Sequence, residues 1–162
     1  VDTKADDHES LLAWTGFLSK APKEHIVVCQ PNDSRVAHMG ELSSETFKFR
    51  GIKGYVVDGG IRDSEFITDI GFQVYHRYFT PLDVVGYWLP DGFDVPITIG
   101  NVEIFPGDYL LADTDGVVIV PREVAAKIAR LSVEAMNKES LVRKAILAGG
   151  DPQEAYIKYG KF

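Results

Sequence analysis

The chain has little cysteine, no long apolar run and no excess of positive charge, and each shortage excludes a class of protein. Cys29 is the single cysteine among 162 residues, which excludes an internal disulfide and suits a reducing compartment. No apolar run approaches the ~20 residues of a membrane span. Residues 1–7 do not resemble a signal peptide. We therefore expect a cytoplasmic protein that has no membrane partner.

Acidic residues outnumber basic ones by 24 to 17, which gives a net charge of −7. Phosphate backbones are bound by basic surfaces, so nucleic acid is not expected as a partner. A small anionic ligand is still compatible with this charge, because one well-placed arginine can override the global sign. The length and the 45% hydrophobic content predict a single domain, residues 1–162, with a sizeable core.

Several familiar catalytic and cofactor signatures are missing. The chain has neither the G-x-G-x-x-G of dinucleotide sites nor the G-x-S-x-G of a nucleophile elbow. Its four histidines show no metal-ligand spacing. His38 is close enough to Gly40 to line a site there, but an ordinary loop histidine is the favoured interpretation. Cys29 ends a short apolar run, which favours a buried core thiol over a nucleophile.

The stretch at residues 55–63 is the most informative part of the chain. An apolar run beginning at Tyr55 reads as a buried strand, and Gly59 and Gly60 predict a tight turn that lets the backbone approach a ligand closely. Arg62 and Asp63 follow, with Asp63 placed to cap a helix over residues 64–70. Open α/β folds bind ligands at such strand ends. Arginine suits a carboxylate or a polarised carbonyl, and aspartate suits Mg²⁺, so the pair predicts an oxyacid bound with a metal.

The boundary signals in the rest of the chain predict an alternation of helices and strands. Apolar spacing, caps and glycine or proline stops indicate these elements. The expected helices are 6–20, 41–49, 122–148 and a short one from 151, and the expected strands are 26–29, 71–75, 95–99, 102–105, 109–112 and 116–120. Several short strands with tight turns predict a compact β layer, and the whole pattern predicts an α/β fold.

Glu41 opens one of these helices. Its position alone favours a simple interaction with the helix dipole, although free N–H groups at a helix start can also hold a carboxylate. Glu134 and Glu139 lie on the long C-terminal helix, where spacing alone favours a solvated face.

Taken in order, several segments resemble the RraA-like family, which includes the class II 4-hydroxy-4-methyl-2-oxoglutarate / 4-carboxy-4-hydroxy-2-oxoadipate aldolases. The segments are residues 40–42, 51–63, 71–74, 106–108 and 112–121. The resemblance implies a three-layer β/β/α fold of the swivelling-domain type. It also implies a homotrimer, sometimes stacked as a hexamer, with active sites between subunits. The N-terminal segment usual in the family is missing from this sequence.

The family's aldolases share an acidic residue, twenty intervening residues and then Arg-Asp, a spacing met here by Glu41, Arg62 and Asp63. The resemblance implies that Arg62 and Glu41 are catalytic and that Asp63 holds Mg²⁺ or Mn²⁺. It further implies that Arg62 and the start of the helix bind the substrate, the latter at Gly40, Glu41, Leu42 and Ser43.

A third catalytic residue, an acid, is implied to come from a neighbouring subunit. Glu139 is the best match for it and Glu134 the alternative. Family members often carry an acid three positions after the Asp, where this chain has Phe66. That departure leaves the substrate preference open.

The function implied is a metal-dependent lyase that cleaves 4-hydroxy-2-oxo acids to pyruvate, with an oxaloacetate decarboxylase side activity. The alternative is a non-catalytic regulator that binds ribonuclease E or another protein. Regulators of this family typically lack the full set of site residues, so the set favours the enzyme.

Overall fold

The computed structural model describes residues 6–162, and it groups the chain into two compact units. Of the described residues, the first unit contains 6–106 and 112–118, and the second contains 107–111 and 119–162. The single domain over residues 1–162 stays a prediction.

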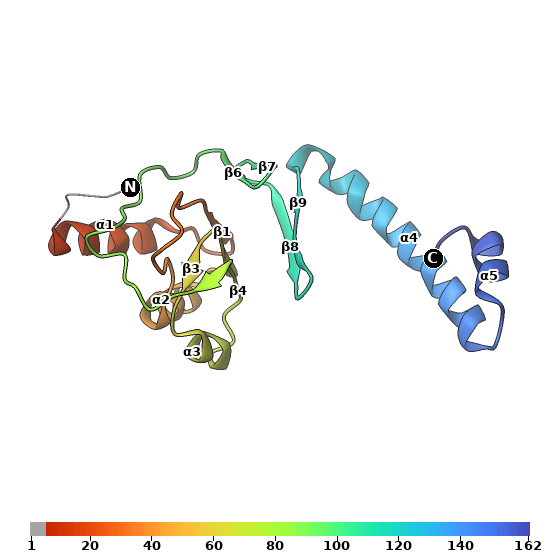
Figure 1. Cartoon of the computed structure of the whole chain (residues 1–162). Helices are drawn as coiled ribbons and strands as arrows, with labels where there is room; N and C mark the ends of the chain where they lie inside the picture. The colour runs from red at the N-terminus through yellow and green to blue at the C-terminus, as the bar shows by residue number, and fades with distance from the viewer. Residues whose placement is uncertain (1–5) are drawn as a thin grey trace. The chain divides into compact units, whose positions relative to one another are not determined.

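Two helices of the first unit, α1 and α2, differ by one residue from their predicted bounds (Figure 1). α1 spans Asp7–Lys20, and the Oδ1 atom of Asp6 accepts a hydrogen bond from the N–H of Glu9 at 2.8 Å. α2 spans Glu41–Arg50 and ends at Gly51, whose φ of 83° is the left-handed geometry that stops a helix. α3 is a short helix over Ser64–Asp69.

Parallel strands form the centre of this unit. β1 (Ile26–Cys29), β2 (Gly54–Val57) and β4 (Val74–Tyr75) make a sheet in the order β1-β2-β4, with β2 parallel to both neighbours. β3 (Gly60–Ile61) pairs in parallel with β5 (Tyr78–Phe79). Parallel neighbours joined through α2 and α3 confirm the α/β class. β4 is shorter than the predicted strand over residues 71–75.

Aromatic rings join the helices to the sheet. Phe17 of α1 lies 5.7 Å from Phe47 of α2 between ring centroids, and Phe47 lies 5.9 Å from Tyr55 of β2. Phe47 and Tyr55 are fully buried, and Cys29 packs against the same core. Burial raises the pKa of the Cys29 thiol to about 11, although a hydrogen bond with Tyr55 opposes the rise. This confirms the core-thiol interpretation.

The β-rich segment after residue 95 contains the four predicted strands as two pairs. β6 (Ile97–Ile99) and β7 (Val102–Ile104) are antiparallel, and β8 (Tyr109–Asp113) pairs with β9 (Gly116–Val120). Residues of the β8–β9 hairpin divide between the two units.

The second unit is mostly helical. After a single 3₁₀ turn, η1 (Arg122–Val124), α4 runs over Ala125–Leu147 and packs against α5, Pro152–Tyr159 (Figure 1). Asp151 caps α5 by accepting from two N–H groups, and Pro152 occupies the first turn, as the sequence predicts. Among residues 6–162, none of the helices combines the length and apolar character that a bilayer crossing requires.

Candidate active site

Asp63 turns the chain from β3 into α3 and points its side chain back toward α2. Its backbone is left-handed, with φ 55° and ψ 37°, a conformation that costs a non-glycine residue roughly 1 kcal/mol or more and is concentrated at functional sites. The carboxylate makes no cap for α3. Instead its Oδ2 accepts from the N–H of Glu41 at 2.9 Å, so the capping role predicted for Asp63 is wrong. The carboxylate therefore accepts a hydrogen bond from the first turn of α2, at a residue twenty-two positions earlier in the chain.

Gly59 and Gly60 serve packing in the core. A Cβ at Gly60 would lie 2.4 Å from a ring carbon of Tyr78, and one at Gly59 would lie 2.8 Å from Nδ1 of His38. The close approach predicted for a ligand is therefore made by side chains of the protein. Gly60 is a member of β3, and its lack of a side chain lets β5 pair with it.

Gly40 is the glycine that the Arg-Asp pair requires. A Cβ there would lie 2.8 Å from Oδ2 of Asp63 and 2.9 Å from Nε of Arg62. The backbone of Gly40 is extended, with φ −147° and ψ −173°, so any residue could adopt it. Glycine is needed at this point for space alone.

Arg62 lies between two carboxylates. Its Nε is 3.4 Å from Oδ2 of Asp63, and its Nη1 donates to Oδ2 of Asp83. Burial acts to raise the pKa of Asp83, but hydrogen bonds from the Val85 and Val84 N–H groups and from Arg62 outweigh it and hold that pKa below its usual value. Asp83 therefore stays ionised and fixes the guanidinium.

Sequence reasoning missed Asp83. It follows Pro81 in an irregular segment, twenty-one residues after Arg62, and no spacing rule pairs the two. The only signal in the sequence is an acid beside a turn residue, which is common on protein surfaces.

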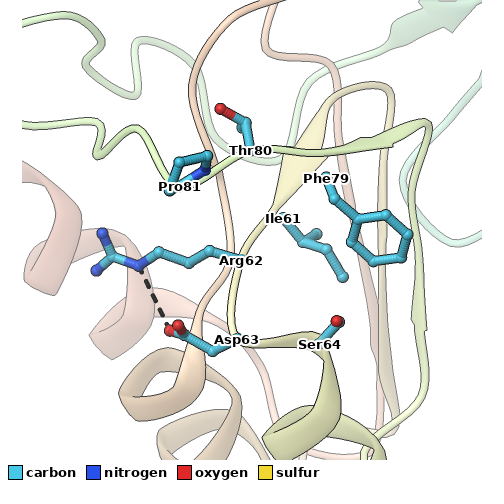
Figure 2. A pocket seen from close by; sticks show the side chains of 7 residues that line it. All are labelled: Ile61, Arg62, Asp63, Ser64, Phe79, Thr80 and Pro81. Atoms are coloured by element: carbon cyan, nitrogen blue, oxygen red, sulfur yellow. Dashed lines mark ion pairs between the residues drawn. The ribbon is translucent and has the colours of Figure 1, made fainter.

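Two pockets flank the arginine. An open one of about 630 Å³ lies beside β3 and β5, lined by Ile61, Arg62, Asp63, Ser64, Phe79, Thr80 and Pro81. Figure 2 shows the Arg62 and Asp63 side chains extending to one side of the β3 ribbon and the exposed ring of Phe79 to the other. A second pocket of about 350 Å³ lies between α1 and the start of α2, and Arg62 and Asp83 also line it.

The predicted substrate-binding residues gather around the second pocket. Its lining includes Gly40, Glu41, Leu42, Ser43 and Arg62. Asp63 lines the first pocket but contacts this group through Arg62 and the N–H of Glu41. The structure thus brings together every predicted site residue of the first unit.

The two glutamates predicted as donated acids lie in the second unit, on α4. Glu139 accepts from Nη2 of Arg143 at 2.6 Å, an ion pair one helical turn along α4. Glu134 is exposed on the same helix. Their contribution to a neighbouring subunit stays a prediction.

The residues around Asp63 fit a metal ion that needs only one protein carboxylate. Within the described part of the chain, no three His, Cys, Asp or Glu side chains converge as a metal-binding group. Asp63 is 38% exposed, and its second oxygen has no hydrogen-bond partner in residues 6–162. Mg²⁺ commonly takes one or two carboxylates and keeps several waters, so Asp63 fits it as the sole ligand from this unit.

His38 lies in an irregular segment of the chain, as predicted, but its side chain belongs to the core. It is fully buried, with its ring 5.0 Å from Trp88 in an edge-on contact. Neither ring nitrogen has a hydrogen-bond partner in the described residues. Burial lowers the pKa of His38 to about 4, with Asp33 opposing the shift. His38 is therefore a neutral core residue, and it lines neither pocket beside Arg62.

The comparisons with known proteins agree with this arrangement. A family model described as RraA-like, Aldolase/RraA, matches residues 3–119. This chain belongs to the Aldolase/RraA family. A Halalkalibacterium halodurans protein that carries the provisional name 4-hydroxy-4-methyl-2-oxoglutarate aldolase is 31% identical over 114 residues, which cover 70% of this chain and 54% of that protein. The chain spans about half the length of the curated relatives it matches, at 53% and 54%.

Solved structures share the family fold. Streptomyces coelicolor RraAS2, described as an unusual member of the RNase ES inhibitor RraA protein family, is 30% identical with a TM-score of 0.75, over 82% of this chain and 68% of that chain. An uncharacterized protein from Pseudomonas syringae pv. tomato has a TM-score of 0.86 at 23% identity, over 91% of this chain and 70% of that one. The RraA-like fold predicted from the sequence is therefore confirmed. The family includes named aldolases and a named ribonuclease inhibitor group, so the activity of this member is a separate question.

Proposed function

We propose that this protein is a divalent-metal-dependent lyase that cleaves 4-hydroxy-2-oxo acids and releases pyruvate. The observation that carries the proposal is the hydrogen bond between Asp63 and the N–H of Glu41, with Arg62 held alongside. It places a carboxylate, a guanidinium and a helix start at one point. The aldolase names of family members support the same chemistry.

The start of α2 binds the carboxylate of the substrate. Gly40, at the N-cap, has no side chain to occupy the first-turn N–H groups, and Asp63 takes that of Glu41. The N–H groups of Leu42 and Ser43 are then the donors for a ligand, and the helix dipole favours an anion there.

Arg62 stabilises the charge that develops during cleavage. Breaking the C3–C4 bond leaves its electron pair on C3 as the enolate of pyruvate, while C4 becomes a carbonyl and its hydroxyl loses a proton. The enolate then takes a proton at C3 and leaves as pyruvate. Two donors of Arg62 are held by Asp63 and Asp83, and Nη2 has no partner within residues 6–162. That group faces the enolate oxygen, where a fixed donor typically lowers the barrier by about 3–4 kcal/mol.

Glu41 accepts the proton of the C4 hydroxyl through a water. Glu41 lines the same pocket as Arg62, and its side chain forms no ion pair within the described residues. A Mg²⁺ or Mn²⁺ ion held by Asp63 would supply Lewis-acid polarisation of the 2-oxo acid. Loss of CO₂ from oxaloacetate leaves the same enolate, so oxaloacetate decarboxylation accompanies the cleavage.

The test is a coupled pyruvate assay on oxaloacetate and 4-hydroxy-2-oxo acids, with Mg²⁺ and with excess chelator. We expect chelation, Arg62→Ala and Asp63→Asn each to lower pyruvate release by about 100-fold or more. Arg77→Ala is the matched control, since Arg77 pairs with Asp58 at 3.2 Å and lines neither pocket beside Arg62. Full activity in chelator would refute the metal dependence.

Glu139 is proposed to complete the site of a neighbouring subunit in a homotrimer or hexamer. Inactive Arg62→Ala and Glu139→Ala chains, mixed under conditions that let subunits exchange, should then regain part of the parent activity. A parallel mixture with Glu134→Ala tests the alternative acid. If activity recovers only in the mixture that contains Glu134→Ala, Glu134 is the donated acid.

The second candidate function is a regulator that binds a protein such as ribonuclease E, which the likeness to RraAS2 supports. It predicts no turnover of any 2-oxo acid and a measurable effect on ribonuclease activity. The grouping of Arg62, Asp63 and Glu41 beside two pockets favours the lyase, because a regulator has no need of it.

A further inference from the structure

The pocket between α1 and α2 has a lining that is apolar in part. The larger apolar side chains of this lining belong to Leu11, Trp14, Leu18, Met39 and Val84. Trp14 is held in place, because its Nε1 donates to Oγ of Ser43 at 3.0 Å and its ring lies edge-on to Trp88 at 6.1 Å. A rigid aromatic wall facing the start of α2 is suited to a short hydrocarbon group.

The hydroxyl groups of the pocket are largely engaged. Thr15 and Thr46 each donate to a backbone carbonyl four residues earlier in their own helix, at 2.8 and 2.7 Å. Ser43 accepts from Trp14. Ser43 and Ser19 are thus the lining hydroxyls that retain a hydrogen for a ligand.

The charges around the pocket are unfavourable for a second carboxylate. Arg62 is the only cationic side chain in its lining, and Asp63 and Asp83 already pair with it. Glu41 adds another negative charge to the pocket lining. A carboxylate buried there would lose its hydration without gaining a cation, which is costly.

We infer that this pocket binds the distal end of the substrate and selects a short, uncharged alkyl group beyond C4. The inference rests on the proposed function for the orientation of the substrate, with its carboxylate at the start of α2. It places this protein apart from relatives named for 4-hydroxy-4-methyl-2-oxoglutarate, whose distal end is a carboxylate. A volume of about 350 Å³ fits a ligand of this size.

Binding can be measured without turnover. The ligands 2-oxohexanoate and 2-oxoadipate have six carbons each and the same 2-oxo acid head, and they differ only in a distal methyl or carboxylate. Trp14 lines the pocket and Trp88 is the second of the two tryptophans, so intrinsic fluorescence of a Trp88→Phe chain reports on Trp14 alone. With Mg²⁺ present, we expect 2-oxohexanoate to bind at least ~10-fold more tightly. Equal binding, or tighter binding of 2-oxoadipate, would overturn the inference.

A cation added to the pocket should reverse the preference. Thr15→Arg places a guanidinium on an exposed lining position, and Leu12→Arg places the same charge on α1 at a position that is 64% exposed and outside the pocket. We expect Thr15→Arg to raise the ratio of 2-oxoadipate to 2-oxohexanoate affinity by at least ~10-fold, and Leu12→Arg to leave it unchanged. An equal change in both variants would mean that long-range charge, not the pocket, sets the preference.

Turnover separates this inference from the proposed function. If pyruvate is released faster from 4-hydroxy-4-methyl-2-oxoglutarate than from 4-hydroxy-2-oxohexanoate, the inference fails and the lyase stands. If no compound yields pyruvate but 2-oxohexanoate still binds selectively, the lyase fails and the pocket assignment stands.

Discussion

Gly40→Ala tests whether the Arg-Asp pair depends on the close approach of the α2 start. A methyl group would lie 2.8 Å from Oδ2 of Asp63 and 2.9 Å from Nε of Arg62, where ordinary contact begins at 3.4 Å. Asp63 must therefore move by about 0.6 Å, which stretches its 2.9 Å hydrogen bond to Glu41 beyond a useful length. Because the backbone of Gly40 is extended, the steric contact is the only perturbation.

The cost follows from the lost bond and the displaced charges. A hydrogen bond to a charged group is worth about 1.5–3 kcal/mol, and overpacking costs a similar 1–3 kcal/mol. We expect the free energy of unfolding to fall by about 1–3 kcal/mol in urea titrations. A displacement approaching 1 Å in a catalytic group can cost about 100-fold, so pyruvate release should fall by about 10–100-fold.

Gly16→Ala is the matched control. A Cβ at Gly16 meets nothing within 4 Å, and the residue lies inside α1, so alanine should stabilise the protein by about 0.5–1 kcal/mol and leave activity unchanged. Parent activity and parent stability in Gly40→Ala would refute the reasoning, because the two side chains could then not be held where they are found.

Three further outcomes follow from the charges and burial. Asp83→Asn should lower the kcat of pyruvate release by about 10-fold with little change in KM, because Arg62 loses a charged partner, and Asp83→Glu should restore part of it. The unfolded chain protonates His38 near pH 6.5, whereas burial lowers the pKa of His38 in the folded protein to about 4. The free energy of unfolding therefore falls as the pH drops between these values, by at most about 1.4 kcal/mol per pH unit. His38→Gln should flatten that slope in urea titrations at successive pH values. Cys29, with its pKa raised to about 11, should resist iodoacetamide at pH 8 until the protein is unfolded.

The elements that the sequence predicts well are those whose signals are local. Asp6 and Asp151 cap their helices through N–H groups two or three residues away, and Gly51 ends α2 through its own backbone angle. Each of these interactions lies within one turn of chain, so the residues that encode it are neighbours in the sequence. Strand β2 is predicted equally well, because all four of its residues are buried and the sequence shows them as a short apolar run.

The interactions that sequence reasoning missed are distant in the chain. Asp63 has the residue type and place of a helix cap, but a competing N–H, twenty-two residues away, takes its carboxylate. Gly59 and Gly60 resemble a ligand turn because nothing local shows that Tyr78 and His38 fill the space beside them. Only the tertiary structure decides between such partners, so the sequence predicts the Arg-Asp motif but not its geometry.

The charges at the site give the final prediction, that cation and substrate bind cooperatively. Glu41, Asp63 and Asp83 contribute three carboxylates against the single guanidinium of Arg62, a formal charge of −2 around the two pockets. An anionic 2-oxo acid approaching alone meets this repulsion, and a divalent cation at Asp63 removes it.

Coupling between two ligands is reciprocal. Mg²⁺ should therefore raise the affinity for 2-oxohexanoate, and 2-oxohexanoate should raise the affinity for Mg²⁺, by the same factor of about 10 or more. Titration calorimetry in both orders measures the two factors. Asp63→Asn should abolish the coupling. The Arg77→Ala control, whose arginine pairs with Asp58, should preserve it. Equal affinity for the 2-oxo acid with and without Mg²⁺ would show that the arginine alone offsets the carboxylates, and the metal would then have no part in binding.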